Sequence, residues 1–117
     1  MIDSLRRRIA ALSYIIVQNR NAHSVFDYEE QNYFNFSSNR NGTNISIYDY
    51  FASSYFSGNI PSIYDYEDNA YVSINFKGNS LSIYSYKYNG YFSVTVNGNN
   101  VSVFDYLHSE YHNYVVN

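Results

Sequence analysis

The sequence predicts a mainly β protein, with an N-terminal amphipathic α-helix followed by an antiparallel up-and-down meander of about ten short strands, curved or barrel-like. Three observations predict it. Apolar residues recur with helical spacing near the N-terminus, one five-residue motif occurs five times after residue 23, and turn sequences separate the alternating runs. In 117 residues we expect a single domain, with a helix and linker over 1–22 and a tyrosine-rich hairpin repeat over 23–117.

An apolar stripe predicts a helix over residues 3–18, because its members follow one another at helical spacing: Leu5, Ile9, Leu12 and Ile16. Asp3 or Ser4 can cap the start of this helix. Arg20 lies just after its end, where a positive charge is favourable for the helix dipole. We expect the run from Arg6 to Arg8 to lie on a solvated helix face.

Five copies of one pentapeptide predict strands. Each copy alternates strictly and is rich in β-branched and aromatic residues, which is typical of a half-buried strand. A second alternating run follows each copy, so each repeat is expected to form a pair of strands. The copies are Ser24–Tyr28, Ser46–Tyr50, Ser62–Tyr66, Ser82–Tyr86 and Ser102–Tyr106.

The turn sequences favour antiparallel hairpins. Gly78-Asn79 provides the positive φ of a two-residue turn, which sets Phe76 opposite Leu81. The same spacing sets Tyr28 opposite Tyr33, with equivalent tyrosine pairs in the other repeats.

A five-coil β-solenoid capped by the helix is the alternative fold, and in it Ile63 would stack on Ile83. Alternation fits both folds, but the matched spacing at the two ends of each strand favours hairpins. In the meander, Pro61 lies opposite Phe56, and we expect a bend there because proline cannot donate a ladder hydrogen bond.

The width of the sheet limits how its apolar face can be covered. Ten strands about 4.8 Å apart extend over about 45 Å, whereas a helix of about 16 residues is only about 24 Å long. One helix cannot cover such a face if the sheet is flat, and soluble monomers rarely leave a large apolar patch exposed. We therefore expect a strongly curved sheet wrapped on the helix, and a homodimer.

Composition excludes several classes of function. The chain has no Cys, so disulfides, thiolate metal sites and cysteine nucleophiles are excluded. Seven basic against ten acidic residues argue against nucleic acid as a partner. The apolar run in the first 20 residues is too short to span a membrane and no signal-cleavage site follows it, so we expect cytoplasmic localisation, with secretion as the alternative. No catalytic motif or cofactor-binding loop is visible, which predicts a protein that is not an enzyme and has no cofactor.

Carboxylates recur at the fourth position of four pentapeptides, which by alternation places them on the aliphatic face near the hairpin ends: Asp27, Asp49, Asp65 and Asp105. Because buried carboxylates need partners, we expect them at the sheet margin, solvated or paired with Arg6, Arg7, Arg8 or Arg20. Their spacing does not support a cation site. His108 and His112 are four residues apart, but one falls in a turn and the other in a strand, so no metal site is expected.

The opposite face of the sheet is the predicted binding surface. Aromatic residues make up 21% of the chain, beside 17 Asn and 17 Ser. Such residues form adaptable protein-binding surfaces, although their cross-strand pairs also stabilise a sheet. We expect a non-enzymatic interaction or structural module that uses this face, with an exposed strand edge, to bind a partner protein or a second copy of the chain. The alternative is a domain that binds a small ligand or carbohydrate. The residues are Tyr48, Tyr50, Tyr64, Tyr66, Tyr71, Tyr84, Tyr86, Tyr91, Phe104, Tyr106 and Tyr111.

Overall fold

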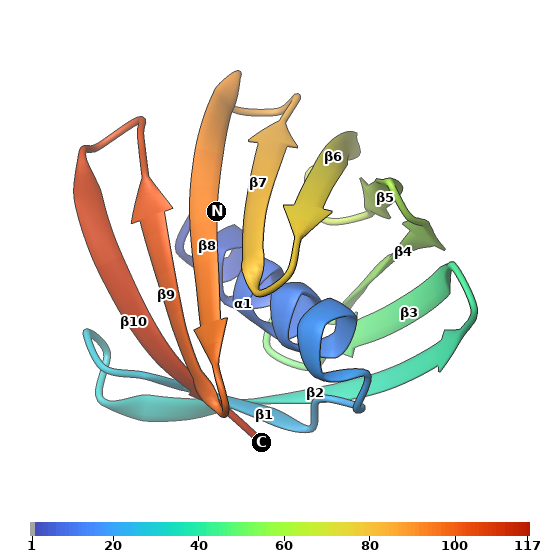
Figure 1. Ribbon diagram of the computed structural model, residues 1–117, viewed down its shortest axis with the longest axis horizontal. Coiled ribbons are helices and arrows are strands. Elements are labelled where there is room, and N and C mark those ends of the chain that lie inside the picture. Colours follow the sequence, from blue (N-terminus) through green and yellow to red (C-terminus); the bar gives the residue numbers. More distant parts are fainter. Residues whose placement is uncertain (1) are drawn as a thin grey trace.

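The computed structural model, which describes residues 2–117, is a closed antiparallel barrel of ten strands around one helix (Figure 1). Each strand pairs with its neighbours in the chain, and β1 pairs with β10 to close the barrel. The elements in order are α1 (Ile2–Gln18), β1 (Ser24–Asp27), β2 (Asn32–Asn41), β3 (Asn44–Asp49), β4 (Ser54–Asn59), β5 (Ser62–Asp65), β6 (Ala70–Lys77), β7 (Ser80–Ser85), β8 (Gly90–Asn97), β9 (Asn100–Asp105) and β10 (Glu110–Val116).

The curved meander predicted from the sequence is confirmed, and the solenoid alternative is wrong because consecutive strands are antiparallel partners. Closure also removes the grounds for the homodimer. The aliphatic face lies inside the barrel and packs around the helix, so no second copy is needed to cover it. The prediction of an exposed strand edge is also wrong, since every described strand has a partner on both sides.

Side chains alternate between the inside and the outside of the barrel, as predicted. Ile83 is fully buried, whereas the next residue, Tyr84, is only half-buried and lies on the outer face. Helix side chains meet the inward-facing ones in one hydrophobic core, and Ile9, Leu12 and Ile15 of the helix are fully buried. Burying each such side chain stabilises the fold by about 1.5–3 kcal/mol. Residues 4–16 are all buried, so the helix is enclosed on every side and does not present the solvated face of an amphipathic helix.

The ends of the helix differ from the sequence prediction. It includes Ile2, so Asp3 and Ser4 lie in its first turn and do not precede it. At the other end, the N–H of Asn19, which has φ of 54°, donates to the Ile15 carbonyl at 3.0 Å. A guanidinium also donates to the Ile15 carbonyl at 3.2 Å, but it belongs to Arg40 of β2, while Arg20 is exposed beyond the helix.

Two kinds of turn connect the strands. Turns at one end have two residues, with glycines such as Gly78 at positive φ, and they set Phe76 opposite Leu81 as predicted. Turns at the other end have four residues. The last residue of each has φ of 52° to 54°, and these residues are Gln31, Ser53, Asn69, Asn89 and Ser109.

Two register predictions are wrong. Tyr33 lies opposite Phe26 and not opposite Tyr28. Phe56 lies opposite Asp65, and Pro61 is in the turn between β4 and β5. The first error arises because a side chain at the end of each odd-numbered strand accepts hydrogen bonds from turn N–H groups, so the turn is two residues longer than the tyrosine spacing indicates. The second arises because the two-residue turn between β4 and β5 is Ile60-Pro61, two residues later than the opposition of Phe56 and Pro61 requires.

The aspartates that end β1, β3, β5 and β9 each bind both a turn and the helix. The Oδ1 atom of Asp49 accepts the N–H groups of Phe51 at 3.0 Å and Ala52 at 3.2 Å, while its Oδ2 accepts from Arg8 at 2.9 Å. Asp27, Asp65 and Asp105 repeat this arrangement. The fourth pentapeptide has Ser85 in place of Asp, and its Oγ accepts the N–H of Tyr88 at 3.2 Å.

Three consecutive arginines of the helix provide the partners of these aspartates. Arg6 contacts Asp105 at 2.8 Å and Arg7 contacts Asp27 at 3.3 Å, while Arg8 lies 2.9 Å from both Asp49 and Asp65. The solvated helix face predicted for Arg6–Arg8 is wrong, since these residues are 5%, 3% and 0% exposed. The reason is that the barrel encloses the helix at the end where the aspartates converge. The predicted pairing of the aspartates with these arginines is confirmed.

Burial and pairing act in opposite directions on the charges of this network. Burial lowers the pKa of Arg8, but Asp65 and Asp49 outweigh it and the net shift is upward, so the guanidinium stays charged. Burial raises the pKa of Asp65 and outweighs the opposing effect of Arg8. Burial also acts to raise the pKa of Asp105, but hydrogen bonds from His108 and the Leu107 N–H lower it overall.

Substitution Arg8→Ala leaves two buried carboxylates without their shared partner. We expect it to lower the free energy of unfolding by about 3–5 kcal/mol, measured by urea denaturation. Arg20→Ala, at an exposed position, should change the same quantity by less than about 0.5 kcal/mol. A loss for Arg8→Ala as small as that of the control would show that the ion pairs do not stabilise the fold.

Asp105 should contribute to the acid sensitivity of the fold. Its pKa in the folded protein is lower than in the unfolded chain, so its stabilising contribution is present above about pH 4 and is lost as the pH falls through the folded value. Urea midpoints measured between about pH 5 and pH 2 should therefore fall less steeply for Asp105→Asn than for the wild type. Glu110→Gln, at an exposed position, serves as the control, and equal slopes for all three proteins would contradict the expectation.

Candidate binding surface

Five clusters of aromatic side chains surround the outside of the barrel. In each cluster, the ring at the third pentapeptide position contacts the ring at the fifth position and a ring on the next strand, with centroids 4.7 to 5.2 Å apart. We call the five clusters the aromatic belt. Its members are Phe26, Tyr28 and Tyr33; Tyr48, Tyr50 and Tyr55; Tyr64, Tyr66 and Tyr71; Tyr84, Tyr86 and Tyr91; and Phe104, Tyr106 and Tyr111.

The local fold explains why the rings meet in threes. Alternation places the third and fifth positions on the same face, and the four-residue turn sets the third position opposite a tyrosine of the next strand, as Tyr84 is opposite Tyr91. Edge-to-face pairs of this kind contribute about 0.5–1.5 kcal/mol each beyond the area that they bury. The central ring of each cluster is half-buried, while the two outer rings are more than half exposed.

All eleven residues predicted to form the binding surface lie on the outer face, in four of the five clusters. The prediction missed the remaining cluster and one further ring: Phe26, Tyr28, Tyr33 and Tyr55. The pentapeptide contained the signal, because Phe26 and Tyr28 occupy the same motif positions as Tyr48 and Tyr50.

A groove lies between the third and fourth clusters, where Tyr71 and Tyr86 line it. These residues are direct neighbours across β6 and β7, since the Tyr86 N–H donates to the Tyr71 carbonyl at 3.1 Å. Each ring contacts the central ring of its own cluster, Tyr64 or Tyr84. The groove between them has a volume of about 490 Å³ and is also lined by Ala70 and Ser62.

Gly90 occupies the position in β8 that Ala70 occupies in β6, and the Leu107 side chain packs against it. A Cβ atom on Gly90 would come within 2.5 Å of the Leu107 side chain, which therefore covers Gly90. The clusters repeat around the barrel, but the spaces between them do not.

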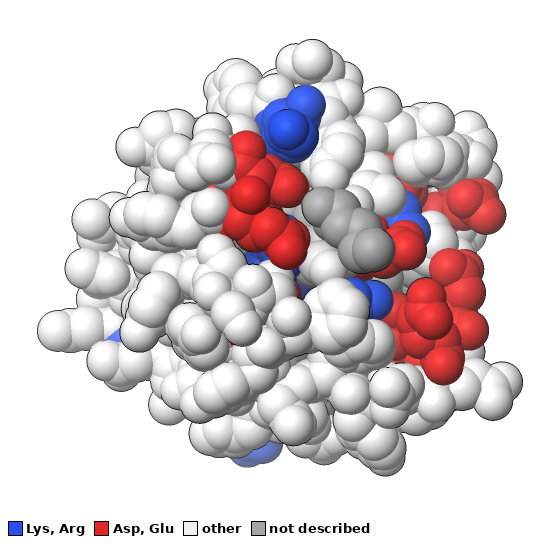
Figure 2. Space-filling model, turned by 180° about the vertical axis from the view of Figure 1, so that it is seen from behind, with Lys and Arg blue, Asp and Glu red and all other residues white. Residues whose placement is uncertain are grey.

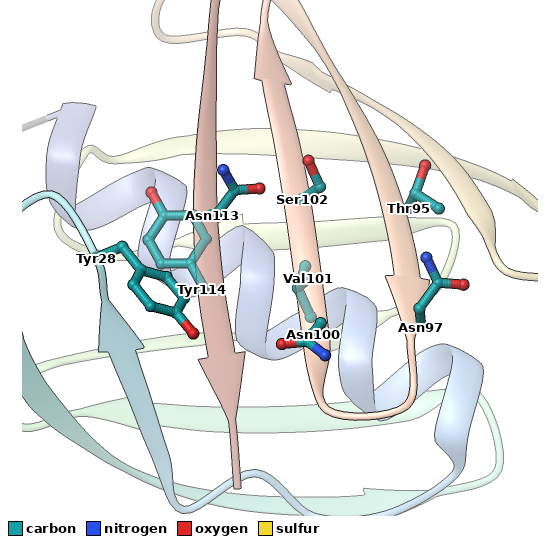
Figure 3. A pocket seen from close by; sticks show the side chains of 8 residues that line it. All are labelled: Tyr28, Thr95, Asn97, Asn100, Val101, Ser102, Asn113 and Tyr114. Atoms are coloured by element: carbon teal, nitrogen blue, oxygen red, sulfur yellow. The ribbon is translucent and has the colours of Figure 1, made fainter.

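A second groove, of about 260 Å³, crosses β8, β9 and β10 and reaches the residue that follows β1 (Figure 3). Most of its lining groups are uncharged donors and acceptors of hydrogen bonds, and Tyr28 stands beside β10 at one end. The lining residues are Tyr28, Thr95, Asn97, Asn100, Val101, Ser102, Asn113 and Tyr114.

The two ends of the barrel differ in charge. The chain has ten acidic residues, and all of them lie at the end of the barrel that has the four-residue turns. Each one ends an odd-numbered strand, lies in or directly after a four-residue turn, or lies in the first turn of the helix. Carboxylates gather around this end in the space-filling view (Figure 2). We call the exposed ones among them, Glu29, Glu30 and Glu110, the acidic rim. Among residues 2–117, the four-residue turns at this end contain one lysine, Lys87, and no arginine.

The histidines do not converge. His108 is exposed in a turn, with Nδ1 2.8 Å from Asp105, whereas His112 is buried in β10, with Nδ1 3.3 Å from Glu29. Among residues 2–117, no three His, Asp or Glu side chains are grouped so that they could hold a metal ion.

Comparison of the chain with protein-family models, curated proteins and solved structures found no match. The helix of the described chain lacks the length and apolarity needed to cross a bilayer. The outer surface and its charges are therefore the basis for any functional inference.

Tyr84 is the ring that orders its cluster, because it contacts both Tyr86 and Tyr91. Tyr84→Ala removes two ring contacts and should lower the free energy of unfolding by about 1–3 kcal/mol in urea denaturation. Tyr86→Ala removes one and serves as the matched control, with an expected loss of about 0.5–1.5 kcal/mol. A larger loss for Tyr86→Ala than for Tyr84→Ala would contradict this account of the clusters.

Proposed function

We propose that the protein is a non-enzymatic interaction module that binds a partner protein through the aromatic belt. The observation that carries the proposal is the exposure of the outer rings: Tyr33, Tyr106 and Tyr111, for example, are 62%, 59% and 70% exposed. Tyr is enriched where proteins bind one another, because a large ring and a polar hydroxyl reach the partner on a side chain with few rotatable bonds.

The ring contacts inside each cluster support this role. Fixing a mobile side chain in an interface costs about 0.5–1.5 kcal/mol. The exposed rings of the belt already contact a central ring at 4.7 to 5.2 Å in the free protein, which reduces that cost. The helix and the inward-facing side chains fill the barrel, which favours a binding site on its outer face.

The belt is strongly convex, and this limits its partners. Five hairpins complete a full circle, so neighbouring clusters face directions that differ by a fifth of a turn. A flat surface can therefore contact one cluster or two adjacent ones, and a small or flexible partner fits best. A second copy of the chain is one of the partners that we propose. The cytoplasmic localisation expected from the sequence remains a prediction.

Carbohydrate binding is the second candidate, favoured by the groove between Tyr71 and Tyr86. Its volume of about 490 Å³ falls within the usual range of small-molecule sites. Two rings line it, and the neighbouring Ser62 hydroxyl can bind a sugar hydroxyl.

The interaction proposal predicts that capture of a partner depends on the exposed rings. The test variant replaces the fifth residue of every pentapeptide by Ser, at Tyr28, Tyr50, Tyr66, Tyr86 and Tyr106. It should capture about one tenth or less of the partner that the wild type captures from an extract of the native host. The control has Ala at the first position of three pentapeptides (Ser24, Ser46 and Ser82), on the same outer face and away from the two grooves described above. Quantitative mass spectrometry measures capture, and circular dichroism establishes that each variant is folded.

Equal capture by the tyrosine variant, the serine control and the wild type would exclude the belt as the binding surface. Light scattering on the purified chain tests the second copy as partner, since self-association should increase with concentration in the wild type and not in the tyrosine variant. Binding of soluble saccharides on a glycan array, lost in Tyr71→Ala and Tyr86→Ala, would favour the second candidate.

A further inference from the structure

We infer that the partner is a cationic, arginine-containing peptide segment, bound where the acidic rim meets Tyr28, Tyr106 and Tyr111. This inference rests on the proposed function and adds to it the place on the belt and the chemistry of the partner. It is carried by the juxtaposition of exposed carboxylates and exposed rings on two adjacent hairpins with an amide-lined groove that continues onto β8.

The chain brings these groups together where β10 closes against β1. The Tyr28 N–H donates to the Asn113 carbonyl at 3.4 Å, so the turn after β1 continues alongside β10. Glu29 lies 3.3 Å from His112, in the same place. Glu110 and Tyr111 begin β10, so the rim and the rings share one corner of the barrel.

The local charge is complementary to a cation. The side chain of Glu29 is 60% exposed, and Glu30 and Glu110 are exposed as well. Arg6 and Arg7 are buried against Asp105 and Asp27, while Glu29 contacts His112 through one carboxylate oxygen and keeps an exposed side chain that can bind an external cation. Lys87 lies in the turn after β7, in a different hairpin.

The exposed rings favour arginine over a simple point charge. A guanidinium stacks on an aromatic face and donates to carboxylates through the same plane. The protein already contains this arrangement, since the guanidinium carbon of Arg7 lies 3.7 Å from the centre of the Phe34 ring while its Nη1 contacts Asp27. At the rim, Tyr28, Tyr106 and Tyr111 are 53%, 59% and 70% exposed and can receive arginine side chains from outside.

The groove of Figure 3 can bind the backbone of such a segment. It starts at Tyr28 and runs over β10, β9 and β8, lined by amide and hydroxyl groups such as those of Asn113 and Ser102. A peptide backbone has one N–H donor and one carbonyl acceptor per residue, and uncharged side chains that both donate and accept can pair with it. The charged groups thus bind the side chains and the groove binds the main chain.

Fluorescence anisotropy with a short labelled peptide of alternating arginine and glycine tests the inference. The wild type should bind it, more tightly than the equivalent lysine–glycine peptide, and more weakly as salt is raised from about 0.05 M to about 0.5 M. The triple variant Glu29→Gln, Glu30→Gln and Glu110→Gln should weaken binding about tenfold. Tyr28→Leu and Tyr111→Leu should each weaken it about two- to fivefold without changing the net charge.

The matched control is Tyr71→Leu with Tyr86→Leu, which removes two rings of similar exposure from other hairpins and should leave the affinity unchanged. Absence of binding to the wild type, equal binding of the two peptides, or an equal loss in the control would each overturn the inference. The outcome is separate from that of the proposed function: if capture of the native partner needs the belt tyrosines but not the rim glutamates, the belt is the binding surface and the cationic partner is wrong.

Discussion

Buried contacts between arginine and aspartate hold the helix and the barrel together, and the rest of the structure depends on them. Each aspartate has two oxygens with separate partners, a turn on one side and the helix on the other. The turn bonds fix where each hairpin reverses, and the bonds to Arg6–Arg8 place four of the hairpins around one short stretch of helix. Removing either partner would leave a buried charge uncompensated, which costs more than the pair itself contributes.

The same constraint produces the outer surface. Because a four-residue turn follows each odd-numbered strand, the third pentapeptide position lies opposite a tyrosine of the next strand, and the rings meet in threes. The carboxylates needed inside also bring the acidic turns to the same end as the rings. A surface that presents tyrosines and carboxylates together is thus a consequence of how the interior is satisfied, and it is the feature on which the proposed binding function is based.

Departures from the repeat distinguish one side of the barrel from another. Ser85 replaces Asp in the fourth pentapeptide, and Leu107 fills the space over Gly90 that stays open beside Ala70. Asn113 lies beside Tyr28 and Asn35 lies beside Tyr50, where the other three clusters have a tyrosine neighbour. A five-fold repeat therefore carries several local environments, and a partner can select one corner of an almost symmetric barrel.

The sequence by itself determined the strands, the face that each side chain occupies and the two-residue turns that contain glycine, because alternation and glycine at positive φ are local properties of the chain. It also placed the eleven predicted aromatic residues on the outer face. Tertiary structure alone decided closure of the barrel, burial of Arg6–Arg8 and the opposition of Tyr33 to Phe26. These depend on partners far apart in the chain, such as Arg8 with Asp65, and the pattern of a single segment contains no record of which distant charge will neutralise it.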